Sequence, residues 1–363
     1  MIISILGVLL TFGAVIFLHE LGHFIVCKFS KIKVEAFSFG FGPELTGYTK
    51  GDTRYSLRAI PLGGYVKPAG ENIEEVSGAP DEYFSKPWYI RLAVVLAGPA
   101  MNYILAFVLF TSVIFLTGQP IASEKAIIGE VIASYPAEAA GLKAGDKILS
   151  VNGIKTNTFE EMARVIHKNI EKEISISYER EGDVKGSVSS VKLTTKKDPS
   201  GQMGLIGVSP LTTYAPIGLI KSVNMGAYQC YYWTAFTVTT LASNIYHRQK
   251  PDLAGPIGIV DIVGKAAHSG LPNFVFLIAL ISVAIGFFNL LPIPLLDGGH
   301  AVLYIFEGIT KKKVTIKVMR VVNSLGIAFL VFILIFATYS DIKRLRIASA
   351  QKKAAVAAVE IGK

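Results

Sequence analysis

The residues His19-Glu20-Leu21-Gly22-His23 form an H-E-x-x-H motif at the end of an apolar block. Side chains four residues apart share one face of a helix, so both imidazoles can bind a single Zn²⁺ with Glu20 beside it. Zinc acidifies a bound water and polarises a carbonyl, and a neighbouring carboxylate can accept the proton of the attacking water. The alternative is a helix end with snorkelling polar groups, but ionisable residues inside a membrane span favour function. The motif therefore predicts a peptide-hydrolysing zinc centre.

A catalytic zinc site needs a third protein ligand and keeps one position open for water. Asp297 lies in the run N-L-L-P-I-P-L-L-D-G-G-H, at the end of a later apolar block. His300 and Glu307 are rival ligands, but each lies further beyond the apolar run. We therefore predict Asp297 as the third ligand.

The elements that position these residues are apolar blocks. The chain has 363 residues, of which 51% are apolar and 17% charged, against roughly 25% charged in a typical soluble domain. This composition excludes a disordered protein and an ordinary soluble enzyme. A helix needs about 20 apolar residues to cross the bilayer core. The sequence predicts four transmembrane helices, at 1–26 with the H-E-x-x-H motif, 89–119, 273–298 with Asp297, and 321–341.

A fifth block, Ser222–Tyr246, also lacks charge but is rich in Asn, Gln, Ser, Thr and aromatic residues. That composition is typical of an interfacial helix, so 201–272 is predicted as an interfacial amphipathic region. Four spans also bring the metal site together. The first and third spans then run in the same direction, and their C-terminal ends lie on the same side of the membrane.

The charge distribution predicts an orientation. Segment 28–86 carries eight Lys and Arg residues and 297–320 carries five, which places both on the cytoplasmic side. The β-rich loop 27–88 and the loop 299–320 are therefore predicted to be cytoplasmic, and the termini to be outside. The basic tail 342–363 argues for the opposite orientation.

Two segments between the spans have their own structure. Residues Val34–Val66 alternate between apolar and polar or small residues, which indicates strands. Residues 120–200 are predicted as an extracytoplasmic α/β domain, and the run Tyr135–Gly153 resembles protease-associated PDZ modules. Its expected elements are the strands Ile127–Ile132, Ile174–Tyr178 and Val188–Thr194 and a helix at Phe159–Lys168.

The motifs in combination resemble the site-2 protease family, and more narrowly the bacterial RseP type of intramembrane zinc metalloprotease with a single PDZ module. The resemblance rests on H-E-x-x-H together with the segments Ala97–Asn102, Asn289–Asp297, Phe39–Pro43, Pro61–Lys67 and Tyr339–Leu345. It implies an α-helical polytopic membrane protein with four transmembrane helices, a membrane-associated β-loop and an inserted α/β PDZ domain.

The resemblance also implies site roles. Zn²⁺ is expected on His19, His23 and Asp297, with Glu20 as the general base. Six further residues are expected to contact substrate: Asn289, Pro292, Pro294, Asn102, Gly40 and Gly42. From the residues alone, Asn102 could orient an oxyanion or a metal ligand, or form a hydrogen bond between helices. Asn289 and the two prolines could equally be a simple helix stop.

The expected function is regulated intramembrane proteolysis of single-span membrane proteins in the bacterial cytoplasmic (inner) membrane. The family implies substrates such as an anti-sigma factor already trimmed by another protease, or signal-peptide remnants. The expected environment is the lipid bilayer, with no nucleic acid partner. The alternative is a non-catalytic membrane adaptor that captures peptides through its PDZ domain, although an adaptor has no use for Glu20.

Overall fold

A computed structural model of the protein describes residues 2–72, 76–180, 187–198, 203–247 and 255–361, with backbone only for 345 and 347–361. Parts of the predicted segments 27–88, 120–200 and 201–272, and the first and last residues of the chain, lie outside these ranges. The chain forms two compact units. The first comprises Met1–Phe115 and Gly218–Lys363, and the second comprises Leu116–Ile217. Each is described by itself.

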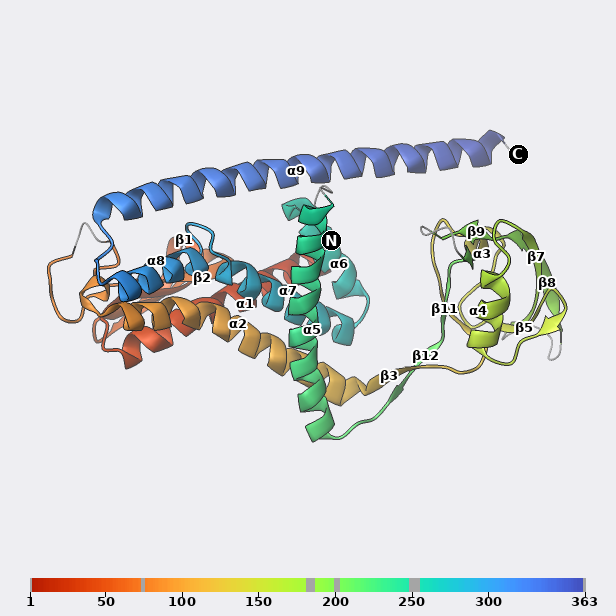
Figure 1. Cartoon of the computed structure of the whole chain (residues 1–363), viewed down its shortest axis with the longest axis horizontal. Coiled ribbons are helices and arrows are strands. Elements are labelled where there is room, and N and C mark those ends of the chain that lie inside the picture. The colour runs from red at the N-terminus through yellow and green to blue at the C-terminus, as the bar shows by residue number, and fades with distance from the viewer. Residues whose placement is uncertain (1, 73–75, 181–186, 199–202, 248–254, 362–363) are drawn as a thin grey trace. The chain divides into compact units, whose positions relative to one another are not determined.

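Helices dominate the first unit (Figure 1). They are α1 (Ile2–Phe29), α2 (Trp88–Thr117), α5 (Leu219–Tyr246), α6 (Pro256–His268), α7 (Leu271–Leu290), α8 (Asp297–Thr310) and α9 (Ile316–Ile361). Among the described helices, four contain a stretch long and apolar enough to cross a membrane, namely Ile2–Phe29, Trp88–Thr117, Leu271–Leu290 and Ile316–Arg344. Each overlaps one of the four predicted apolar blocks.

Helix α1 packs closely against its neighbours. A Cβ added at Gly22 would lie 2.3 Å from the carbonyl oxygen of Ala97, so only glycine allows α2 to approach this closely. Further along α1, Val15 is fully buried in a cluster with Val263 of α6 and Phe274 of α7. Helix α1 thus contacts α2 and the consecutive helices α6 and α7, which lie far from it in the sequence.

The strands β1 (Val34–Lys50) and β2 (Thr53–Pro68) form a bent hairpin beside α1. Phe37 pairs with both Tyr55 and Val66, so the first half of β1 lies between the two halves of β2. Residues 64–68 therefore form one edge of this small sheet. The ring of Phe37 stacks on Phe24 of α1 at 4.6 Å, which fixes the sheet to that helix.

The region around Asp297 differs from the sequence prediction. Segment 273–298 was expected to be one helix, but α7 ends at Leu290 and α8 begins at Asp297. Pro292 and Pro294 lack the N–H that a helix needs, and each disfavours a helical residue before it. Most of the expected loop 299–320 is also helical, since α8 continues to Thr310. Helix α9 runs on through the expected tail to Ile361.

In its described residues, the second unit contains short strands and the helices α3 and α4 (Figure 1). Its central sheet has the strand order β6-β5-β7-β8. The elements are β3 (Gln119–Ala122), β4 (Ile128–Val131), α3 (Pro136–Ala139), β5 (Lys147–Val151), β6 (Ile154–Lys155), α4 (Phe159–His167), β7 (Glu173–Glu179), β8 (Ser189–Thr194), β9 (Lys196–Lys197), β10 (Gly204–Leu205), β11 (Val208–Pro210) and β12 (Thr212–Ala215). The strands and the helix expected from the sequence all appear, within two residues at each end.

The second unit extends beyond the predicted boundary at residue 200. Strand β11 pairs with β4, and β12 pairs with β3, so both ends of the segment belong to the same unit. These pairings join residues 77 to 96 positions apart in strands of three or four residues. Such short strands give little period-two signal in the sequence.

Candidate metal centre

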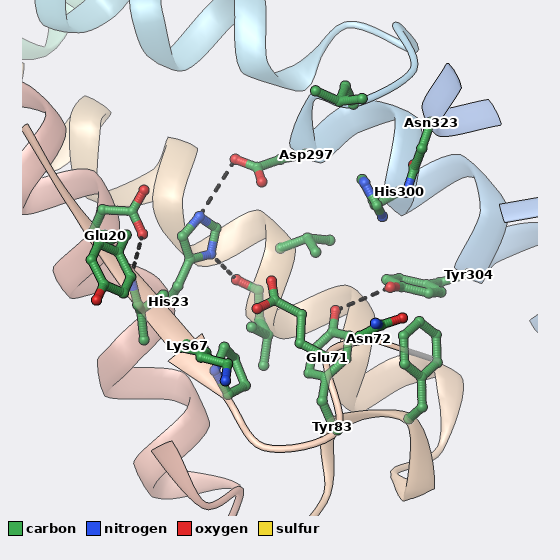
Figure 2. Close-up of a pocket in the computed structure, with 18 of the residues that line it drawn as sticks. Glu20, His23, Lys67, Glu71, Asn72, Tyr83, Asp297, His300, Tyr304 and Asn323 are labelled. Carbon is green, nitrogen blue, oxygen red and sulfur yellow. Dashed lines mark hydrogen bonds and ion pairs between the residues drawn. The ribbon is translucent and has the colours of Figure 1, made fainter. Parts of the chain in front are cut away.

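The two histidines of the motif and Asp297 converge in the first unit. His19 and His23 lie one turn apart on α1, with their Nε2 atoms 3.2 Å apart. Asp297, the first residue of α8, places its Oδ2 atom 3.1 Å from His19 Nε2 and 3.6 Å from His23 Nε2. Figure 2 shows His23 and Asp297 facing each other from the two helices. Among the described residues, these three side chains form a group that could hold one metal ion.

The donor atoms suit zinc. Ligands at about 2.0–2.1 Å around a tetrahedral Zn²⁺ are about 3.3 Å apart, and the three separations here lie between 3.1 and 3.6 Å. His23 Nδ1 donates to the carbonyl oxygen of Val94 at 2.7 Å. Because Nδ1 then carries the proton of the neutral ring, the lone pair is on Nε2, which faces the cluster. Asp297 Oδ2 is buried and, within the described ranges, accepts no hydrogen bond of suitable geometry. A cation would satisfy these atoms.

One face of α2 lines the back of this cluster. Val94, Gly98 and Asn102 are spaced four residues apart and therefore lie on the same face. The carbonyl oxygen of Val94 contacts His23 Nδ1, and Asn102 Nδ2 lies 3.2 Å from His19 Nδ1. Gly98 lies against both rings. A Cβ at Gly98 would lie 2.3 Å from His23 Nε2 and 2.8 Å from His19 Cε1. The glycine is thus required by the two imidazoles.

Glu20 is held beside the cluster by the hairpin. Its Oε2 atom accepts a hydrogen bond of 3.1 Å from the backbone N–H of Val66. Because Val66 lies on the edge segment 64–68, its N–H points away from the sheet and toward α1. Figure 2 shows this bond on the side of His23 away from His300. The carboxylate is fixed next to the metal-binding atoms without contributing to them.

Gly298 and an ion pair position Asp297. A Cβ at Gly298 would lie 2.2 Å from the carbonyl oxygen of Leu291, so glycine lets the loop fold back against the start of α8. Nine residues after Gly298, Glu307 accepts a 2.5 Å hydrogen bond from Arg91 of α2. Both side chains are at most one-tenth exposed. This buried pair fixes α8 to α2.

The structure separates the predicted ligand from its rivals. Glu307 is paired with Arg91 and lies outside the group of three potential ligands. His300 lines the same cavity as Asp297, but it is also not part of that group. Burial lowers the pKa of His300 below its usual value.

A cavity of about 720 Å³ opens onto the cluster. Its walls come from α1, β1, β2, η1 (Tyr83–Ser85), α2, α7, α8, α9 and the loops next to them. Asn289, in the last turn of α7, lines this cavity. The other predicted substrate contacts, Pro292, Pro294, Gly40, Gly42 and Asn102, are not among its lining residues. Gly40 and Gly42 instead form the bend of β1, with φ angles of +90° and +83°.

Three contributors to the site were not predicted. The N–H of Val66 is a backbone group, which no residue type marks. The Arg91–Glu307 pair joins residues 216 positions apart. Asn323 of α9 also lines the cavity, as Figure 2 shows beside His300. For Arg91 and Asn323 the sequence did contain a signal, because each is a polar residue within a predicted transmembrane helix.

These features define a membrane metallopeptidase: apolar helices surround a centre of two histidines and one carboxylate, and a second carboxylate outside the ligand group lies beside it. Comparison with known families identifies which kind. The model of peptidase family M50 matches residues 7–333, and the chain therefore belongs to that family.

Curated relatives agree with this assignment. A Clostridium acetobutylicum protein named "Putative zinc metalloprotease" is 37% identical over 93% of this chain and 97% of its own length. "Zinc metalloprotease RasP" of Geobacillus kaustophilus is 28% identical over 94% of this chain and 98% of its own length. The chain is thus a zinc-dependent metalloprotease of a membrane family.

Among solved structures, part of the chain is similar to the PDZ domain of an SdrC-like protein from Listeria monocytogenes. That match is 19% identical, with a TM-score of 0.21, and covers 25% of this chain and 92% of the other.

Proposed function

We propose that this chain is an intramembrane endopeptidase in which His19, His23 and Asp297 hold Zn²⁺ and Glu20 is the general base. The observation that carries the proposal is the convergence of three metal-binding atoms and one separately held carboxylate at a cavity walled by apolar helices. Nothing else in the described part of the chain combines these features.

Zinc, Glu20 and Val66 have separate roles in the proposed hydrolysis. Bound zinc supplies an acidified water and a polarised peptide carbonyl. Glu20 accepts the proton of the water as its oxygen forms a bond to the carbonyl carbon. The same carboxylate then delivers that proton to the leaving nitrogen as the C–N bond breaks. The N–H of Val66 keeps Glu20 directed at the reacting atoms during both transfers.

The substrate is proposed to be a single-span membrane protein cut near the cytoplasmic side. Its helix hides every amide in internal hydrogen bonds, so it must unwind before the peptide bond can be attacked. Asn289 lines the cavity where an unwound segment would rest, and the edge 64–68 offers it backbone hydrogen bonds. Pro292 and Pro294 would contribute by ending α7 and shaping the loop that follows Asn289. Gly40 and Gly42 contribute by shaping the bend of the hairpin rather than by lining the cavity.

The four apolar helices are proposed to cross the bacterial inner membrane, with α5 in the interface and the second unit outside. We further propose that the second unit is a PDZ domain that filters substrates by size. Such a filter would explain a need for prior trimming by another protease, and suitable substrates are trimmed anti-sigma factors and signal-peptide remnants.

The test uses the purified full chain in detergent, a single-span model substrate and a zinc assay. Glu20→Gln is expected to abolish cleavage while zinc content stays at one equivalent, because this carboxylate is outside the ligand set. Glu160→Gln, on the exposed face of α4, is the matched control and should cleave normally. Normal cleavage by Glu20→Gln would refute Glu20 as the general base. Wild-type protein with neither metal nor cleavage would refute the protease in favour of a peptide-capturing adaptor.

A further inference from the structure

Asn102 is a fully buried polar residue in the middle of α2. It does not line the cavity, so an unwound substrate there cannot touch it. Its Nδ2 atom lies 3.2 Å from His19 Nδ1, and its Oδ1 atom has no hydrogen-bond partner among the described residues. A polar side chain left partly unsatisfied in an apolar helix needs a reason, because each buried unpaired group costs about 1–3 kcal/mol.

The chemistry of the imidazole supplies that reason. His19 can offer its Nε2 lone pair to a metal only if its Nδ1 carries the proton. A protonated Nδ1 is a donor and requires an acceptor, whereas the amide nitrogen that faces it is also a donor. A half-turn of the amide exchanges two atoms of similar size and places Oδ1 against Nδ1. The orientation in the structure leaves Oδ1 without a partner among the described residues, whereas the turned amide pairs it with the Nδ1 proton, so the tautomer of His19 decides between them.

We infer that Asn102 is a positioning residue that accepts the Nδ1 proton of His19 and thereby fixes its metal-binding tautomer. The inference rests on the proposed role of His19 as a zinc ligand. Asn102 would do for His19 what the carbonyl oxygen of Val94 does for His23. Such partners outside the ligand set orient the ring and raise its affinity for the metal.

The surroundings of Asn102 hold it in place for this role. Ser282 of α7 donates to the backbone carbonyl of Asn102 at 2.8 Å. A Cβ at Gly286 of α7 would lie 3.2 Å from the Cβ of Asn102, so the helices are in close contact there. Gly98 and Asn102 are one turn apart, which brings the amide to the level of His19. Helix α7 thus supports the ligand through Asn102.

The experiment measures zinc affinity by competition with a chromophoric chelator, on the purified full chain. Asn102→Leu keeps the volume but removes the acceptor, and it is expected to weaken zinc binding 10- to 100-fold. Asn102→Asp keeps an acceptor toward Nδ1 and is expected to stay within a few-fold of wild type. The visible spectrum of the cobalt(II)-substituted protein should change in the Leu variant and not in the Asp variant.

Thr234→Val is the matched control, because Thr234 also forms a hydrogen bond between helices, 3.0 Å from Tyr103 Oη of α2, but away from the metal centre. It should keep wild-type zinc affinity. Wild-type affinity in Asn102→Leu, with only a lowered Tm, would overturn the inference and reduce Asn102 to helix packing. Wild-type protein that binds no zinc would instead refute the proposed function, so the two failures are distinguishable.

Discussion

Gly98→Ala is the substitution for which the structure sets the sharpest expectation. The added Cβ would lie 2.3 Å from His23 Nε2, 2.6 Å from its Cε1 and 2.8 Å from His19 Cε1. Ordinary contacts of this kind are about 3.5–4.0 Å, so the rings would have to move by roughly 1 Å. A functional site tolerates displacements of about 0.5 Å. One methyl group therefore exceeds the tolerance of the metal centre.

The magnitude follows from two effects. Inserting a methyl group into a close-packed interior costs about 1–3 kcal/mol of folding free energy. Displacing both imidazoles is expected to weaken zinc binding at least as much as loss of a supporting hydrogen bond, which is about 10- to 100-fold. Cleavage of the model substrate should fall in proportion to zinc occupancy, and should partly recover at excess zinc.

The assay compares zinc affinity and cleavage for wild type, Gly98→Ala and Gly218→Ala. Gly218 precedes α5, and no heavy atom of the described residues lies within 4 Å of a Cβ added there, so its variant controls for the change of residue type. Size-exclusion chromatography selects folded protein before each measurement. Wild-type zinc affinity in Gly98→Ala would show that the imidazoles do not need this space, and would refute the assignment of the α2 face as the back wall of the site.

Three further outcomes are expected. Asp297→Ala should lower zinc content well below one equivalent, and full occupancy in metal analysis would mean that another residue is the third ligand. Val66→Pro removes the N–H that holds Glu20 and should lower kcat with little change in KM or zinc content. Val66→Ala keeps the N–H and should behave as wild type, so equal kinetics for the two variants would contradict the positioning role. Arg91→Met should destabilise the protein by about 3–5 kcal/mol, because it leaves Glu307 buried and unpaired. Adding Glu307→Leu should restore much of the Tm, and a double variant no more stable than the single one would contradict this account.

The sequence was informative where residue type and spacing carry the chemistry. The i, i+4 spacing of His19 and His23 predicted their shared helix face, and the four apolar blocks predicted the candidate spans. The choice of Asp297 over His300 and Glu307 followed from its distance to the apolar run. The structure brings Asp297 to the histidines and leaves both rivals outside the group.

The sequence was less informative where position depends on the backbone or on distant partners. Pro292 and Pro294 indicated a break, but not that a new helix would begin at Asp297. The N–H of Val66 has no signature in residue type. Gly98 was part of a recognised segment, yet its purpose became clear only once two imidazoles were placed against it.

The ribbon formed by β3 and β12 bears on how the protein can change. Gln119–Ala122 pairs with Thr212–Ala215, and paired strands lie about 4.8 Å apart. The second unit therefore begins and ends at neighbouring points, as an inserted module does. Its removal or replacement leaves two chain ends that a short turn can join, and the order of helices carrying His19, Glu20, His23 and Asp297 is preserved. The second unit and the helices that carry the metal centre can thus evolve as separate modules of one chain.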